Sequence, residues 1–148
     1  MSAAYQSILV AYDDSEPSKR ALERAATLAE AFGSKVLVTS ILAFGHSSPK
    51  SAQSLHRSPS FAADEEVRSA QAILEQRGIS AETVNATGDP ATAIARLAKD
   101  HGADVVVIGT RELGTVQRVL GQSVSQSVSR RVRCDVLIVH PGHATEES

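Results

Sequence analysis

The sequence predicts an α/β fold in which helices cover both faces of an open parallel sheet. Short apolar segments alternate along the chain with longer segments whose apolar residues recur at helical spacing, and glycine follows most of the helical segments. Such alternation is typical of parallel strands joined by right-handed crossovers. The chain has 148 residues, 42% apolar and 22% charged, which suffices for one core. We therefore expect one domain over residues 1–148.

The first elements are a strand, a helix and a second strand. Ile8–Ala11 is too short for a helix and fits a strand buried on both faces. Residues 13–18 are rich in residue types that begin helices, and apolar residues then recur at helical spacing up to Gly33, which is expected to end the helix. Val36–Leu42 is the second apolar strand.

A serine-rich segment interrupts this alternation. Residues 43–60 contain six serines and two prolines and are predicted to form a flexible inserted loop that closes over a site beside the second strand. A second helix follows, with apolar residues between Val67 and Leu74, and Gly78 is expected to close it. Ala81–Ala86 alternates weakly, which is typical of an outer strand.

The second half repeats the pattern. Gly88–Pro90 combines a turn, a helix N-cap and a proline at the first helical position, and Gly102 is expected to end that helix. Val105–Ile108 is the most apolar strand. Ser123 is placed to cap a last helix, which leads into the final apolar strand, Val136–Val139.

The composition argues against several classes of function. A net charge of −2 and a pI of about 6.2 disfavour binding to nucleic-acid phosphates, and 3% aromatic residues disfavour stacking on single strands. No apolar run approaches the length of a membrane helix, residues 1–7 do not resemble a signal peptide, and Cys134 alone cannot form an internal disulfide. We expect a cytoplasmic protein that binds neither nucleic acid nor a membrane and has a polar tail at residues 141–148.

Ligands of open parallel sheets bind beyond the carboxyl ends of the strands, where the strand order reverses. Tyr12 and Asp13 follow the first apolar strand, and the Asp13 carboxylate could accept ribose hydroxyls or orient a metal-bound water. The alternative is that Asp13 or Asp14 caps the first helix. The sequence leaves both interpretations open.

A second candidate site follows the fourth apolar strand. Gly109–Gly114 has the position of a phosphate-binding loop, because glycine lets backbone N–H groups approach an anion, and Ser123 offers a hydroxyl at a helix N-terminus. A glycine-containing connector before a capped helix is the alternative. The sequence contains no GxxxxGK[ST], GxGxxG or GxSxG motif.

Other charged residues are interpreted as structural. Arg130, Arg131 and Arg133 fit the end of a helix, where they would stabilise its dipole, with a patch for an acidic partner as the alternative. His140 and His143 belong to the end of the chain, where a metal-binding pair is not expected. We expect no metal site and no catalytic residue.

Three segments resemble the universal stress protein (UspA) family. Ile8–Ser18 resembles the opening of the family, Gly88–Pro90 resembles its mid-chain turn, and residues 109–140 resemble its closing block. The resemblance covers about residues 6–140. It implies a Rossmann-like sheet of five strands in the order 3-2-1-4-5 and a regulatory protein of the stress response rather than an enzyme.

The resemblance also implies a homodimer. In this strand order the last strand lies at a sheet edge, although its residues are all apolar. An exposed apolar edge invites pairing with another chain, and a two-fold axis makes the pairing self-complementary. We expect an antiparallel homodimer through Val136, Leu137, Ile138 and Val139, and the sequence identifies no other protein partner.

Many members of the family bind ATP through the pattern G-x2-G-x9-G-[ST], which this sequence matches in part. Gly109 and Ser123 match the first glycine and the final serine. Glu112 and Gln122 stand where the family has its other two glycines, and Gly121 lies one position too early. Two of the three glycines are therefore replaced.

The resemblance assigns roles to two further positions. Asp13 matches the acidic residue near the ribose, and Ile41 matches the apolar contact to adenine. The implied nucleotide site consists of Ala11, Tyr12, Asp13, Ile41, Gly109, Arg111, Glu112, Gly121, Gln122, Ser123 and Val124.

These departures affect the phosphate end of the site. Glu112 brings a carboxylate near the phosphates, and one like-charge pair at about 5 Å costs ~3 kcal/mol at an effective dielectric constant of ~20, before screening. Gln122 adds a side chain where a close backbone is needed, while Arg111 and Arg118 offset part of the repulsion. We expect weak or altered binding of adenine nucleotides, with ATP bound less well than AMP, and Mg²⁺ only together with a nucleotide.

Three functions compete on the sequence. The first is a nucleotide-sensing regulator of the stress response, and the second is a nucleotide-free dimeric module for protein interaction, in which Glu112 and Gln122 mark an abandoned site. The third is an adenylating or ATP-hydrolysing enzyme. The third is disfavoured because the HIGH-like and SGGxDS-like loops of such enzymes are missing from the sequence.

Overall fold

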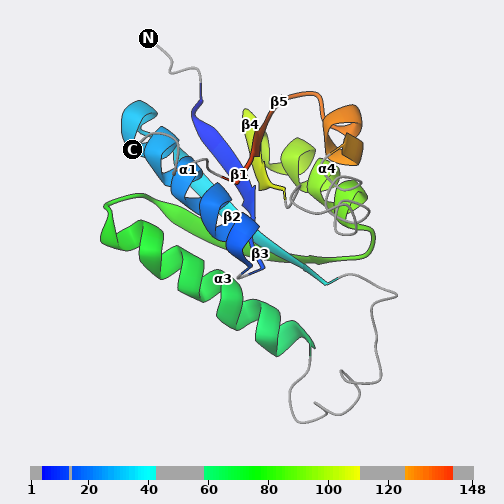
Figure 1. The fold of residues 1–148 in the computed structure, drawn as a ribbon, viewed down its shortest axis with the longest axis horizontal. Helices are drawn as coiled ribbons and strands as arrows, with labels where there is room; N and C mark the ends of the chain where they lie inside the picture. Colours follow the sequence, from blue (N-terminus) through cyan, green and yellow to red (C-terminus); the bar gives the residue numbers. More distant parts are fainter. Residues whose placement is uncertain (1–4, 14, 43–58, 111–125, 142–148) are drawn as a thin grey trace.

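The structure is a computed structural model that describes residues 5–13, 15–42, 59–110 and 126–141. Strands and helices alternate along these residues, as the sequence predicts (Figure 1). Each predicted strand is found, with bounds that differ by at most one residue at either end. The elements are β1 (Ser7–Ala11), α1 (Glu16–Phe32), β2 (Lys35–Leu42), α3 (Pro59–Gln76), β3 (Ala81–Thr87), α4 (Pro90–His101), β4 (Val105–Gly109) and β5 (Asp135–Val139), and residues 126–131 are helical.

The five strands form one parallel sheet in the order β3-β2-β1-β4-β5. This confirms the predicted α/β class and the strand order 3-2-1-4-5. In the register of the sheet, Val10 of β1 aligns with Val38 of β2 and with Val107 of β4. The strand order reverses at β1, because the chain first builds outward through β2 and β3 and then returns to the other side with β4. The crevice for a ligand is therefore expected between β1 and β4.

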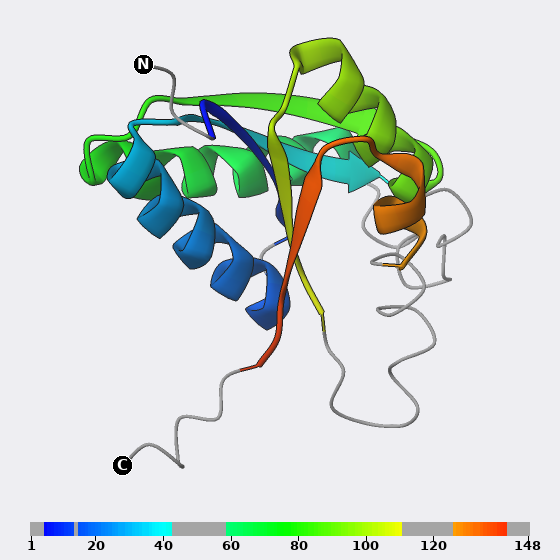
Figure 2. The ribbon, with the colours of Figure 1, turned by 90° about the horizontal axis from the view of Figure 1, so that it is seen from above.

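Helices cover both faces of the sheet, with α1 and α3 on one side and α4 on the other (Figure 2). On one face, Val10 and Leu74 belong to a core cluster that the sheet forms with α1 and α3. On the other face, Leu9, Ile94 and Val128 belong to a cluster that the sheet forms with α4 and residues 126–131. Successive strand residues point to opposite faces, and both faces of the sheet are covered, so β1 is apolar from Ile8 to Ala11 and β4 from Val105 to Ile108.

Local sequence signals set the ends of two helices as predicted. Asp89 caps α4, and Pro90 occupies its first turn. Gly33 and Gly102 end α1 and α4 with φ of 70° and 64°, a left-handed conformation that costs glycine little. Because these signals involve only a few neighbouring residues, they can be recognised from the sequence alone.

The start of α3 corrects one predicted boundary. The serine-rich loop was expected to reach residue 60, but the helix begins at Pro59, a residue type that fits the first helical turn. Residues 43–58, and with them the prediction of a flexible loop over the site, lie outside the described residues. The same is true of Ser123 as a helix cap and of residues 142–148.

Among the described residues, no helix combines the length and the apolar character that a membrane span requires.

Candidate functional site

The carboxyl end of β1 places three of the predicted site residues side by side. Ala11 is the last residue of the strand and is partly exposed. Tyr12 is 3% exposed, and its backbone N–H donates to the Thr39 carbonyl at 2.9 Å, which continues the contact with β2 beyond the end of β1. Asp13 then emerges at the surface. One exposed carboxylate thus lies at the carboxyl ends of the strands, where ligands of such sheets bind.

Hydrogen bonds at the start of α1 hold Asp13 in place. Its Oδ1 accepts from the Ser15 backbone N–H at 3.0 Å and from the Ser15 hydroxyl. Its own N–H donates to Ser18 Oγ at 3.2 Å. Both of the contacts with Ser15 use Oδ1, and the side chain is exposed.

The N-cap of α1 is Ser15, whose Oγ accepts from the Ser18 backbone N–H at 3.3 Å. The alternative that Asp13 caps this helix is therefore wrong, and Asp14 lies outside the described residues. The Ser15 hydroxyl forms hydrogen bonds with both the helix and Asp13, so it links the N-terminus of α1 to the candidate site. Asp13 keeps the ribose interpretation that the sequence left open.

Gly109 ends β4 next to the start of α1. A Cβ at this position would lie 2.6 Å from the carbonyl carbon of Pro17 and closer still to its oxygen. Only glycine fits between the two backbones, and its φ lies outside the left-handed region. Thr110, which follows, is 3% exposed and donates its N–H to the Val139 carbonyl at 3.1 Å. Gly109 is thus required for helix–strand packing, a role that sequence spacing did not reveal.

The register brings the ends of β1 and β4 together. Val10 aligns with Val107, so the carboxyl ends of these two neighbouring strands, at Ala11 and Gly109, lie close together. Ile41 belongs to β2, where its backbone is level with Ala86 of β3. The remaining predicted site residues lie outside the described residues; they are Arg111, Glu112, Gly121, Gln122, Ser123 and Val124.

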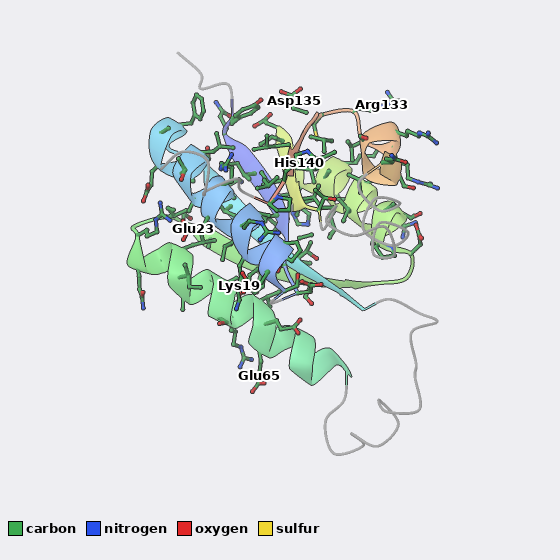
Figure 3. The ribbon with its side chains drawn as sticks, in the orientation of Figure 1. Lys19, Glu23, Glu65, Arg133, Asp135 and His140 are labelled. Atoms are coloured by element: carbon green, nitrogen blue, oxygen red, sulfur yellow. The ribbon has the colours of Figure 1, made fainter. Side chains whose placement is uncertain are left out.

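Two other charged residues, Asp89 and Arg133, lie beside the ends of helices and strands. Hydrogen bonds from the backbone N–H and then the hydroxyl of Thr92 lower the pKa of Asp89, with a smaller effect from Arg131. Gly88–Pro90 therefore works as a helix-starting turn. Arg133, between residues 126–131 and β5, precedes Asp135 at the amino end of that strand (Figure 3). Arg133 thus lies near the amino ends of the strands, whereas Asp13 follows the carboxyl end of β1.

The described residues contain no group of three or more His, Cys, Asp or Glu side chains that could hold a metal ion. His140 follows β5 and is exposed (Figure 3), whereas His143 lies outside the described residues. The chemistry that the described part of the site offers is hydrogen bonding by an exposed carboxylate beside the backbone at the end of β4.

Comparison with known proteins decides the family. The model of the universal stress protein family matches residues 4–140. The chain belongs to the universal stress protein family. Universal stress protein Rv1636 of Mycobacterium tuberculosis is 33% identical, over 93% of this chain and 98% of the relative.

Solved structures of universal stress proteins share the fold. A crystal structure of a universal stress protein in complex with cAMP has a TM-score of 0.71 and 31% identity, covering 94% of this chain and 98% of the other. The universal stress protein of Archaeoglobus fulgidus in complex with dAMP has a TM-score of 0.67 and 24% identity, covering 92% and 98%. The predicted resemblance is confirmed over nearly the whole chain, and this universal stress protein has the fold of its relatives.

Proposed function

We propose that this universal stress protein is a non-enzymatic regulator of the stress response that binds an adenine nucleotide with one phosphate group. The observation that carries the proposal is the exposed, fixed carboxylate of Asp13 at the end of β1, beside the end of β4 at Gly109. A carboxylate oxygen can accept hydrogen bonds from ribose hydroxyls, and bonds to a charged acceptor are worth about 1.5–3 kcal/mol. The crevice between these strands is where open parallel sheets bind nucleotides.

The preference for one phosphate rests on two residues of the family pattern. Glu112 would repel a triphosphate, and Gln122 replaces a glycine at the phosphate loop. The solved universal stress protein that is 31% identical to this chain is a complex with cAMP, which carries a single phosphate. Mg²⁺ would then enter only with nucleotide phosphates, and Ser123 with the Gly109 backbone would hold the single phosphate.

Calorimetric titration with AMP and ATP tests the proposal. The native chain should bind AMP more tightly than ATP, and the Glu112→Gly, Gln122→Gly double variant should gain ATP affinity. The two substitutions are combined because both act on the same phosphates and need not be additive. Asp13→Asn, which keeps the size of the side chain, should weaken AMP binding. Tight ATP binding by the native chain would show that the charge argument is wrong.

A nucleotide-free dimeric interaction module is the alternative function, and the two edges of the sheet favour a dimer in either case. Edge strand β5 is apolar from Val136 to Val139, and its middle residues are half-buried. The opposite edge strand, β3, exposes Glu82 and Thr83. We place the dimer contact at β5, with the two copies antiparallel. Absence of AMP binding in both the native chain and the double variant would favour the nucleotide-free module.

The same proposal includes organisation and location. Residues 1–148 form one domain, with the five described strands in one sheet. The protein works in the cytoplasm, a location consistent with Cys134 as the single cysteine of the chain.

A further inference from the structure

Thr39 of β2 carries a buried hydroxyl that the fold itself does not use. The residue is 0% exposed, and its Oγ1 has no hydrogen-bond partner among the described residues. Its backbone carbonyl, in contrast, accepts from the Tyr12 N–H. Buried hydroxyl groups are nearly always hydrogen-bonded, because burial without a partner costs free energy. A ligand bound to the protein would supply the hydrogen-bond partner that this hydroxyl lacks.

The surroundings of Thr39 are apolar. Its neighbours across the sheet are Ala11 in β1 and Val84 in β3. Both pack against the core cluster on the α4 side, and so does Leu37, two residues earlier in β2. Side chains alternate along a strand, so Thr39 faces this same side. A threonine in this layer has no apolar advantage over the isosteric valine, which points to a role for the hydroxyl.

Thr39 lies level with the end of β1. It aligns with Ala11, the last residue of that strand, which is small and partly exposed. The buried hydroxyl thus lies one strand away from the carboxyl end of β1, where the ligand is expected to bind. Ser40 points to the opposite face, where its hydroxyl donates to Glu66 of α3 at 3.2 Å.

We propose that the Thr39 hydroxyl hydrogen-bonds the polar edge of the adenine base and helps to select it. The inference rests on the proposed function, because it assigns a further contact to the same site. Strands β2, β1 and β4 lie side by side in that order. Neighbouring strands are about 4.8 Å apart, so β2 and β4 are separated by about 10 Å, the scale of a nucleoside monophosphate. The base then lies over β2, the ribose at Asp13 of β1, and the phosphate at the end of β4.

A hydroxyl is suited to this contact. It can donate to a ring nitrogen of adenine or accept from the exocyclic amine. A site whose buried polar group is paired only when the correct base is bound rejects ligands that leave it unpaired. Thr39 would therefore contribute to the choice of ligand rather than to the stability of the fold.

Titration calorimetry with AMP, together with thermal unfolding of the free proteins, tests this inference in four forms of the full chain. They are the native protein, Thr39→Val, Thr39→Ser and Ser40→Ala. Thr39→Val keeps the shape and removes the hydroxyl, so AMP affinity should fall about three- to tenfold, while the Tm of the free protein stays the same or rises. Thr39→Ser restores a hydroxyl and should retain most of the affinity. Ser40→Ala removes the neighbouring buried hydroxyl on the other face and should leave AMP affinity unchanged.

The outcomes separate this inference from the proposed function. If the native chain does not bind AMP, the proposed function fails, and this contact fails with it. If the native chain binds AMP and Thr39→Val binds it equally well, only this inference is overturned. A lower Tm for Thr39→Val without loss of affinity would also overturn it, because the hydroxyl would then serve the fold. Loss of affinity that serine does not restore would assign the effect to packing and would overturn it as well.

Discussion

Arg77 donates two hydrogen bonds to the Glu30 carboxylate, each 2.9 Å long. This bidentate pair joins the residue after α3 to the last turns of α1, and a third contact of 3.4 Å reaches Glu23, which Figure 3 labels on α1. The two helices that cover one face of the sheet are thereby joined at one end through side chains 47 residues apart in the sequence. The hydrogen bonds from Arg77 lower the pKa of Glu30.

The Arg77–Glu30 pair makes stability depend on pH in a defined direction. Glu30 has a lowered pKa when folded, so its contribution is complete above its ordinary value of 4.5 and is lost as the pH falls through the folded value. Arg77→Met should lower the Tm at pH 7 by about 1–3 °C, because the pair is at the surface. The difference from the native chain should shrink at acidic pH.

Thermal unfolding from pH 7 down to pH 3 measures this difference. Arg68→Met is the matched control, because Arg68 is exposed on α3 and should show no comparable change in Tm. A difference between the native chain and Arg77→Met that is constant over this range would contradict the assignment to Glu30.

Gly109 should tolerate no side chain. In Gly109→Ala the new methyl group would collide with the Pro17 backbone, and such overpacking typically costs about 1–3 kcal/mol. Gly78→Ala is the informative comparison: that glycine has open space around it but a φ of 77°, so only the backbone conformation is penalised, by about 1 kcal/mol. Urea unfolding should show the greater loss for Gly109→Ala. If both variants lost the same free energy of unfolding, α1 would be able to move away from β4 and accommodate the methyl group.

The N-cap of α1 should contribute measurably to stability. Ser15→Ala removes the acceptor for the Ser18 backbone N–H, a change that usually costs about 1 kcal/mol. Thr27 provides a control on the same helix, because its hydroxyl donates back to the Glu23 carbonyl and caps nothing. Thr27→Ala should change the free energy of unfolding by less than about 0.5 kcal/mol. If both variants unfold at the same urea concentration, the Ser15 hydroxyl does not act as a cap.

Two helix ends could be predicted from neighbouring residues, whereas two features that involve distant elements could not. The Asp89 cap and Gly33 were predictable, because helix ends are set by a few adjacent residues. The contact of Gly109 with Pro17 was not, because nothing in the local pattern shows which backbone will approach from another element. The orphan hydroxyl of Thr39 was also missed, since β2 reads as an ordinary apolar strand until its neighbours are known.

The edge strand β5 should carry the dimer contact. Ile138 is half-buried and aligns with Ile108 of β4, which leaves the other side of the strand without a neighbour among the described strands. A lysine at an edge blocks strand pairing, because its charge would have to be buried in the contact. Ile138→Lys should therefore convert a dimer into a monomer at micromolar concentration, as measured by light scattering.

The opposite edge of the sheet supplies the matched control for that experiment. Thr83→Lys places the same charge at an exposed position of β3 and should leave the dimer intact. Ile138 also packs against the core cluster on the α4 side, so circular dichroism must show that Ile138→Lys remains folded. A native chain that is monomeric, or a folded Ile138→Lys variant that remains dimeric, would exclude the contact through β5. If both lysine variants were monomeric, the effect could not be assigned to β5, because the added charge alone would then dissociate the dimer. That outcome would also contradict the prediction.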